Sequence, residues 1–121
     1  IIAVLERYDF LTTKESYLIS LNLPGERLDE VDLNKQKEYL IENGLSSFFK
    51  RLEWIGFNHG DVKSSNFFLF NKELFVFDLD SARKRFFKSR VKNKIIKDQQ
   101  RILTSLGEHE KTRDALTRRF Y

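Results

Sequence analysis

The residues that could do chemistry are concentrated in one short segment of the chain. A polar loop supplies a carboxylate at Asp61, a cation at Lys63 and an amide oxygen at Asn66. Twelve residues after Asn66, Asp78 adds a second carboxylate at the end of an apolar run. Taken singly, each of these side chains is common in turns and caps. Their joint order and spacing make them a candidate site.

These residue types match what the transfer of a phosphoryl group requires. The charge of ATP is neutralised by a divalent metal with hard oxygen ligands, which Asn66 and Asp78 could supply. A carboxylate such as Asp61 can orient an acceptor hydroxyl and take its proton. A cation such as Lys63 can stabilise charge on the transferred group. Because a carboxylate ending an apolar run is costly to bury without a partner or a metal, Asp78 is the hardest of the four to dismiss.

A helix and a hairpin are expected to position this loop. An apolar stripe with a period of 3.6 residues predicts a helix from near Asn34 to Gly56, although Asn43-Gly44 could divide it in two. After the loop, Phe67–Phe70 and Leu74–Phe77 predict two short strands joined by a turn at residues 71–73. This hairpin folds the chain back, so that Asn66 and Asp78 could reach one ion.

The two ends of the chain carry further elements. Ile2–Asp9 and Glu15–Leu23 read as strands joined by a turn at Thr12–Lys14. A second amphipathic helix is expected to end at Gly107, and the tail to Tyr121 could form another helix. The apolar positions of the helix that ends at Gly107 are Val91, Ile95, Ile96, Ile102, Leu103 and Leu106.

Composition narrows the class of protein. The 121 residues suit one small domain, and the lack of cysteine excludes disulfides, thiolate metal sites and a cysteine nucleophile. The chain has no methionine and begins with Ile1, so we expect a fragment or a missing N-terminus. No apolar run approaches the roughly 20 residues of a membrane span, and Glu6 and Arg7 interrupt any signal peptide, so a soluble, cytoplasmic protein is expected.

The net charge of +4 arises largely from the stretch 83–101, where Asp98 is the single acidic residue. Such a stretch is most often a solvated helix face. It could also meet an anionic membrane surface or a phosphorylated sugar. Nucleic acid is not expected as a partner, because interleaved stacking aromatics are lacking.

The pattern His-x-Asp-x-Lys-x-x-Asn at residues 59–66, followed by a strand ending in Asp78, resembles the catalytic loop and metal-binding strand of protein-kinase-like enzymes. The ending Phe77-Asp78-Leu79-Asp80 is most similar to the lipopolysaccharide core kinases (the Kdo/WaaP family), small cytoplasmic bacterial enzymes that phosphorylate inner-core sugars with ATP. The resemblance covers roughly residues 1–106 but is distinctive only over 59–80.

The resemblance implies a role for each matching position. Asp61 matches the catalytic base, and Lys63 the lysine that contacts the γ-phosphate of ATP. Asn66 and Asp78 match the Mg²⁺ ligands, which together with Lys63 would bind the cofactor, and His59 matches a structural histidine beneath the metal-binding strand. The role of Asp80, where protein kinases have glycine, is open.

Two departures from the family pattern matter. Gly60 stands where protein kinases often have an arginine that reads an activation-loop phosphate, so control by that route is not expected. The chain also has no Gly-x-Gly-x-x-Gly loop and no convincing N-lobe lysine or helix glutamate. The phosphate-covering half of the ATP cleft is therefore expected outside this sequence, and the 121 residues alone are expected to be inactive.

The implied fold is α+β and protein-kinase-like, a partial catalytic domain over residues 1–121. Residues 1–23 would be the last N-lobe strands, 24–30 the hinge and 31–121 the C-terminal lobe. The leading hypothesis is an ATP- and Mg²⁺-dependent kinase acting on a lipopolysaccharide core sugar, peripheral to the inner membrane. Two alternatives stay open: a protein or small-molecule kinase of the same fold, and a catalytically incomplete remnant that binds a partner.

Overall fold

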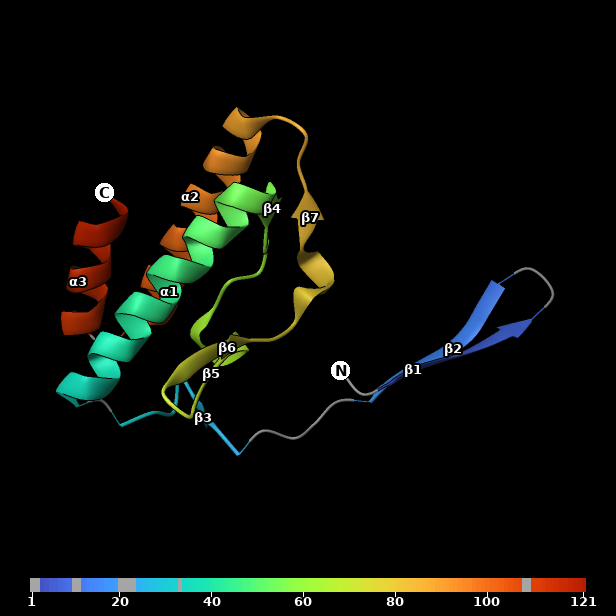
Figure 1. The fold of residues 1–121 in the computed structure, drawn as a ribbon, viewed down its shortest axis with the longest axis horizontal. Helices are drawn as coiled ribbons and strands as arrows, with labels where there is room; N and C mark the ends of the chain where they lie inside the picture. The colour runs from blue at the N-terminus through green and yellow to red at the C-terminus, as the bar shows by residue number, and fades with distance from the viewer. Residues whose placement is uncertain (1–2, 10–11, 20–23, 33, 108–109) are drawn as a thin grey trace.

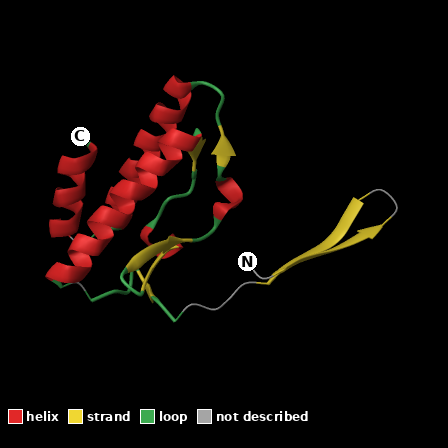
Figure 2. Cartoon of the chain, viewed as in Figure 1, coloured by secondary structure: helices red, strands yellow, loops and turns green. Residues whose placement is uncertain are grey.

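The computed structural model of the chain describes residues 3–9, 12–19, 24–32, 34–107 and 110–121. The elements run in the order β1 (Ala3–Asp9), β2 (Thr12–Ile19), β3 (Glu26–Arg27), α1 (Lys35–Ile55), β4 (Phe57–Asn58), the 3-10 helix η1 (Ser64–Asn66), β5 (Phe67–Phe70), β6 (Glu73–Val76), the 3-10 helix η2 (Leu79–Ser81), β7 (Arg83–Lys84), α2 (Lys88–Ser105) and α3 (Glu110–Phe120). The three α-helices pack together, and the strands β3–β7 lie beside them (Figures 1 and 2). The described residues thus confirm the expected α+β class.

The N-terminal strands form the expected antiparallel hairpin, but its turn was predicted in the wrong place. Thr12 and Thr13 pair with Asp9 and Tyr8, so both threonines belong to β2 rather than to the turn. Threonine is β-branched and favours strands, which agrees with this placement. The end of the predicted second strand, residues 20–23, lies outside the described residues.

Helix α1 has the ends that the sequence predicts. The Asn34 side chain caps its first turn by accepting a hydrogen bond from the backbone N–H of Lys37 at 2.9 Å. Gly56 ends the helix in the left-handed conformation, with φ of 78°, which glycine adopts without a steric penalty. The division at Asn43-Gly44 that the sequence left open does not occur, because α1 is continuous from Lys35 to Ile55.

The hairpin β5–β6 has its first strand where it was predicted, but its second strand is Glu73–Val76 instead of Leu74–Phe77, and its turn is tighter. Glu73 pairs with Phe70, so the turn has two residues, Asn71 and Lys72, instead of the expected three. Both have positive φ, 48° and 63°, which matches the right-handed twist of the flanking strands. Strand β3, inside the stretch 24–30 expected to be a hinge, pairs with β5 and completes a three-stranded sheet.

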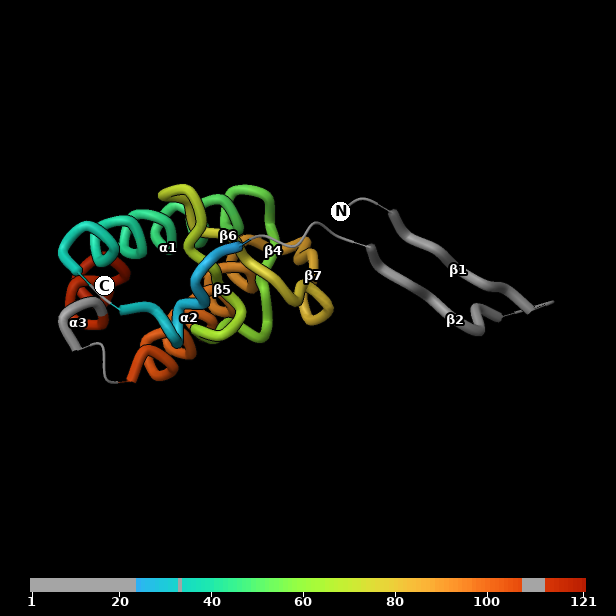
Figure 3. The backbone as a smooth tube through the Cα atoms, turned by 90° about the horizontal axis from the view of Figure 1, so that it is seen from below, coloured from blue at the N-terminus to red at the C-terminus, as the bar shows by residue number. Residues whose placement is uncertain are grey.

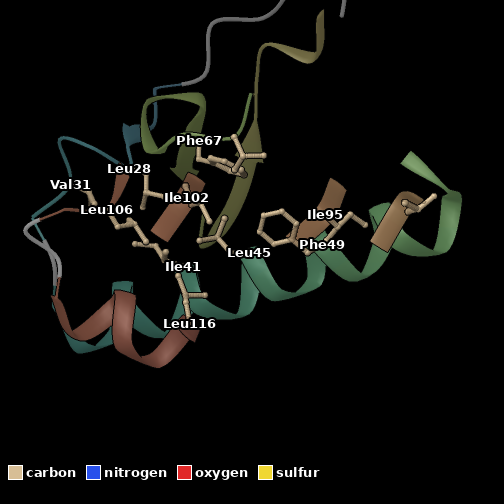
Figure 4. Close-up of a cluster of buried hydrophobic side chains, with 12 residues drawn as sticks. Leu28, Val31, Ile41, Leu45, Phe49, Phe67, Ile95, Ile102, Leu106 and Leu116 are labelled. Atoms are coloured by element: carbon tan, nitrogen blue, oxygen red, sulfur yellow. The ribbon is translucent and has the colours of Figure 1, made fainter. Parts of the chain in front are cut away.

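The core fills the space between the three helices and this sheet. Leu45 and Phe49 of α1, Ile95 and Ile102 of α2 and Leu116 of α3 are buried in it (Figure 4). Burying a side chain of this size contributes roughly 1.5–3 kcal/mol, so the helices are held mainly by this apolar contact. The apolar stripe predicted for the second helix and the existence of a third helix are both confirmed.

The pair β4–β7 forms the frame of the loop that follows β4. Phe57 pairs with Lys84 and Asn58 with Arg83, and the backbone N–H of Arg85 donates to Gly56 O at 2.8 Å. These bonds fix both ends of the segment that carries the candidate residues. Within the described ranges, no helix is both long and apolar enough to cross a membrane.

Candidate active site

His59 anchors the start of the candidate loop to the end of the β5–β6 hairpin. The ring is buried, its Nε2 lies 3.1 Å from Phe77 O, and its Nδ1 accepts from the backbone N–H of Asp61 at 3.3 Å. Because Nδ1 is an acceptor in this arrangement, the proton of a neutral ring is on Nε2 and is donated to Phe77 O. His59 therefore has the structural role that was expected of it.

A buried carboxylate on α2, Asp98, binds the backbone of the same loop. One of its oxygens, Oδ2, accepts from the backbone N–H groups of His59 and Gly60 at 2.9 and 3.0 Å. Its other oxygen accepts from Arg101 at 3.3 Å, and Arg101 also donates to Gly60 O. Figure 3 shows the chain between β4 and β5 running beside α2. Asp98 is 1% exposed, so both of its oxygens depend on these donors.

The sequence reasoning missed Asp98, although a signal was present. Asp98 is the lone acid of the basic stretch 83–101 and lies three residues after Ile95 and four before Ile102. This spacing places it on the apolar face of α2, where an unpaired carboxylate is costly. A buried acid on an apolar stripe was therefore readable as a residue with partners elsewhere in the fold.

Gly60 lets the loop approach η2 closely. Its φ is 89°, and a Cβ at this position would lie 2.7 Å from the backbone oxygen of Ser81. Any side chain would meet backbone that cannot swing away, and the left-handed conformation would be strained as well. The close approach to Ser81 and the left-handed backbone therefore explain why residue 60 is a glycine, where protein kinases often have an arginine.

Asp61 and Lys63 form an ion pair at the surface of the loop. Lys63 Nζ lies 3.0 Å from Asp61 Oδ2, and the two side chains are 48% and 44% exposed. The hydrogen bond from Lys63 holds the pKa of the Asp61 carboxyl below its ordinary value, and the charge of Lys63 acts in the same direction. Asp61 is therefore a carboxylate at neutral pH, able to accept a proton and open to an incoming molecule.

Asn66 is oriented so that its amide oxygen remains available. The side chain is largely buried, and Nδ2 donates to Asp61 O at 3.0 Å. Within the part of the chain that the structure describes, Oδ1 of Asn66 has no hydrogen-bond donor. A buried acceptor without a donor is unusual in proteins, and a cation would satisfy it.

The hairpin brings the backbone of Asn66 next to that of Asp78. Phe67 pairs with Val76, and the N–H of Phe77 donates to Asn66 O at 2.8 Å, so Asp78 follows the residue opposite Asn66. Asp78 has φ of 57° and an exposed side chain. The sequence argument assumed that the Asp78 carboxylate is buried, and the exposed side chain shows that this assumption is wrong. Its left-handed backbone, which aspartate tolerates better than most residues, is the feature that sets it apart.

The side-chain oxygens of Asn66 and Asp78 are of the types that Mg²⁺ binds. Asn66 and Asp78 offer one amide and one carboxylate oxygen, and Mg²⁺ usually takes only one or two carboxylates besides phosphates and water. Among the described residues, no group of three or more His, Cys, Asp and Glu side chains could hold a metal by itself. Asp80 is exposed, and its backbone oxygen accepts from Arg83 at 2.7 Å.

Ser64 and Ser105 fix the far end of the loop. The backbone N–H of Ser64 donates to Ser105 Oγ at 2.8 Å, and Ser64 Oγ donates to Ser105 O at 3.1 Å. Ser105 is the last residue of α2, so the helix that carries Asp98 contacts the loop at both ends. The sequence reasoning also missed Ser105, since nothing in its neighbourhood along the chain indicates this contact.

Comparison with protein-family models and with curated proteins found no match for this chain. A functional assignment therefore depends on the residues of the loop and on their geometry.

Proposed function

We propose that this chain is part of an ATP- and Mg²⁺-dependent phosphotransferase with an alcohol acceptor, of protein-kinase-like fold. The observation that carries the proposal is the loop between β4 and β5. Asp98 and Ser105 of α2 hold its backbone, and the His59 ring joins it to Phe77 O, while the carboxylate of Asp61 stays exposed beside Lys63. A loop held this rigidly, with reactive groups facing outward, is typical of sites that position a reactant.

Each side chain then has a distinct task. Asp61 orients the acceptor hydroxyl and takes its proton as the hydroxyl oxygen bonds to the γ-phosphorus of ATP, whose bond to the bridging oxygen breaks to release ADP. Lys63 places positive charge beside the group in transfer. Asn66 and Asp78 would hold the metal, which neutralises phosphate charge when bound. Because ATP is the proposed donor, the reaction belongs in the cytoplasm.

Among acceptors, we favour a sugar of the lipopolysaccharide inner core. The support for this choice is the resemblance of residues 59–80 to that family of kinases, above all the ending Asp78-Leu79-Asp80. A protein or small-molecule acceptor is the second candidate. Labelled ATP offered with core oligosaccharide, with a generic protein substrate and with small sugars separates the two, because only one acceptor class should become labelled.

The test of the proposed function is Asp61→Asn in the complete protein. Removing the base should slow transfer by about 10²–10⁴-fold while the variant stays folded. The matched control is Asp32→Asn, an exposed aspartate before α1 for which we expect transfer at the normal rate. Transfer by the Asp61 variant at a rate near that of the unmodified protein would refute the proposal.

A remnant that only binds a partner is the remaining alternative. It is distinguished by Asp78→Asn, measured as Mg²⁺-dependent binding of an ATP analogue. The phosphotransferase proposal expects this binding to weaken. If neither metal nor nucleotide binding changes, the binding module becomes the better assignment.

A further inference from the structure

A basic hollow of about 220 Å³ lies beside the candidate loop, between β4, η2 and α2. Its lining contains one carboxylate, Asp98, and four cations, Arg85, Lys94, Lys97 and Arg101. The charge of Asp98 is already engaged, because its oxygens accept from Arg101 and from two backbone N–H groups of the loop. The hollow therefore carries an excess of positive charge.

The two arginines of this basic hollow are held in place by the fold. Arg85 Nε donates to Oδ1 of the buried Asn58 at 2.9 Å. Arg101 donates to Gly60 O and to Asp98 Oδ1. A guanidinium has five N–H donors, so each arginine keeps donors for a further acceptor. A guanidinium that is already ordered loses less entropy when it binds an anion.

The two lysines are free to complete such a site. Lys94 and Lys97 lie three residues apart on α2, and in the described ranges neither has an ion-pair or hydrogen-bond partner. Both also line an adjoining hollow of about 360 Å³, together with Arg85 and Arg90. A concave site lined by charges of one sign focuses the electric field and raises the local concentration of counter-ions.

We propose that the basic hollow binds a phosphomonoester. Arginine and lysine are the side chains that recognise phosphate, by paired hydrogen bonds and by charge respectively. The volume suits a single phosphate group with part of its ester, rather than a nucleic-acid duplex. Gly60 lines the hollow and directly precedes Asp61, so the lining of the hollow ends one residue before the proposed catalytic base. Resting on the proposed function, the phosphate belongs to the acceptor, a sugar that already carries one.

The binding test uses glucose 6-phosphate as the probe and glucose as the uncharged comparison, at constant ionic strength. The complete protein should bind the phosphate ester saturably, and Lys94→Gln/Lys97→Gln should weaken binding at least tenfold. The matched control is Lys88→Gln/Lys92→Gln, which removes the same charge from α2 outside both hollows and should change the Kd less than twofold. Equal losses in both pairs, or no saturable binding at all, would overturn the site.

A second arm distinguishes a soluble phosphate ester from a lipid headgroup. The same proteins are titrated with phosphatidylcholine vesicles that contain phosphatidic acid. Binding to the soluble ester without vesicles supports the hollow. Binding to vesicles alone, weakened equally by both lysine pairs, overturns it in favour of a general attraction to membranes.

A kinetic arm separates this inference from the proposed function. For a phosphorylated acceptor, Lys94→Gln/Lys97→Gln should raise KM about tenfold and leave the KM for ATP unchanged. If transfer occurs but neither KM nor Kd changes, the site is refuted and the phosphotransferase stands. If the phosphate ester binds through Lys94 and Lys97 but no acceptor is ever phosphorylated, the site stands and the phosphotransferase is refuted.

Discussion

The pairing of Asp61 with Lys63 sets the protonation state of the proposed catalytic base. The ion pair is about half exposed, so solvent screens it and its contribution to stability is small. The ion pair matters more for the proton affinity of the Asp61 carboxylate, which it lowers. A carboxylate kept charged by a neighbouring ammonium is ready to accept a hydrogen bond from an alcohol, although the alcohol must then share Asp61 with Lys63.

Lys63→Gln should raise the pKa of the Asp61 carboxyl toward the ordinary aspartate value of about 3.9. With Lys63 present, the folded pKa lies below that of the unfolded chain. The pair therefore stabilises the fold above pH 4 or so, and this stabilisation is lost as the pH falls through the folded pKa. Carboxyl carbon NMR during a pH titration measures the change directly.

The control for this titration is Lys72→Gln, which removes an exposed lysine in the β5–β6 turn. We expect it to leave the titration of Asp61 unchanged. An Asp61 pKa that is the same with and without Lys63 would contradict the proposed coupling.

Helix α1 and strand β6 approach each other so closely that a glycine is needed between them. A Cβ on Gly44 would lie 2.7 Å from Leu74 Cβ. Leu74 Cβ is attached to the strand backbone and cannot rotate out of the way, unlike the end of a flexible side chain. Contact between α1 and β6 in turn positions the hairpin that carries Asn66 and Asp78 near the loop.

Gly44→Ala should destabilise the protein, although alanine is the better helix former by about 1 kcal/mol. The overlap with Leu74 should outweigh that gain and lower the free energy of unfolding by about 1–2 kcal/mol. Urea denaturation measures the difference. Ser47→Ala, at an exposed position of the same helix, should instead leave stability unchanged or raise it slightly. A Gly44 variant as stable as the Ser47 variant would show that the approach is not tight.

The candidate site exists because packing of the whole chain places α2 beneath the loop. Asp98 is 39 residues from His59 in sequence, and Ser105 is 41 residues from Ser64. These contacts form only when the apolar faces of α1 and α2 meet in the shared core (Figure 4). Folding of the core and ordering of the loop should therefore be coupled.

Asp98→Asn should loosen the loop and lower the free energy of unfolding by about 3 kcal/mol. An amide has one acceptor oxygen, so it cannot serve both Arg101 and the two backbone N–H groups. Hydrogen exchange should accelerate at the amides of His59 and Gly60 more than at amides in the middle of α1. Asp32→Asn, at an exposed site, is the control and should change neither quantity. Unchanged exchange at both loop amides would mean that Asp98 does not hold them.

Local signals were enough to predict most of the helices. The cap at Asn34, the stop at Gly56 and the apolar stripe of α2 all act within a few residues, and the structure has each of them in place. The structure differs from the expectations at positions where contact with another strand or helix determines the local structure. The register of β2 against β1 places Thr12 in a strand. At Gly44, where the sequence left a division of the helix open, α1 continues and packs closely against Leu74 of β6.

The sequence by itself determined which groups the loop can offer. Asp61, Lys63 and Asn66 are so close along the chain that their bonds to one another follow from local turns. Only the tertiary structure decided what holds that loop, through Asp98 and Ser105 on α2. The physical reason is that contacts across about 40 residues depend on how two apolar helix faces pack, and no spacing within the loop encodes that packing.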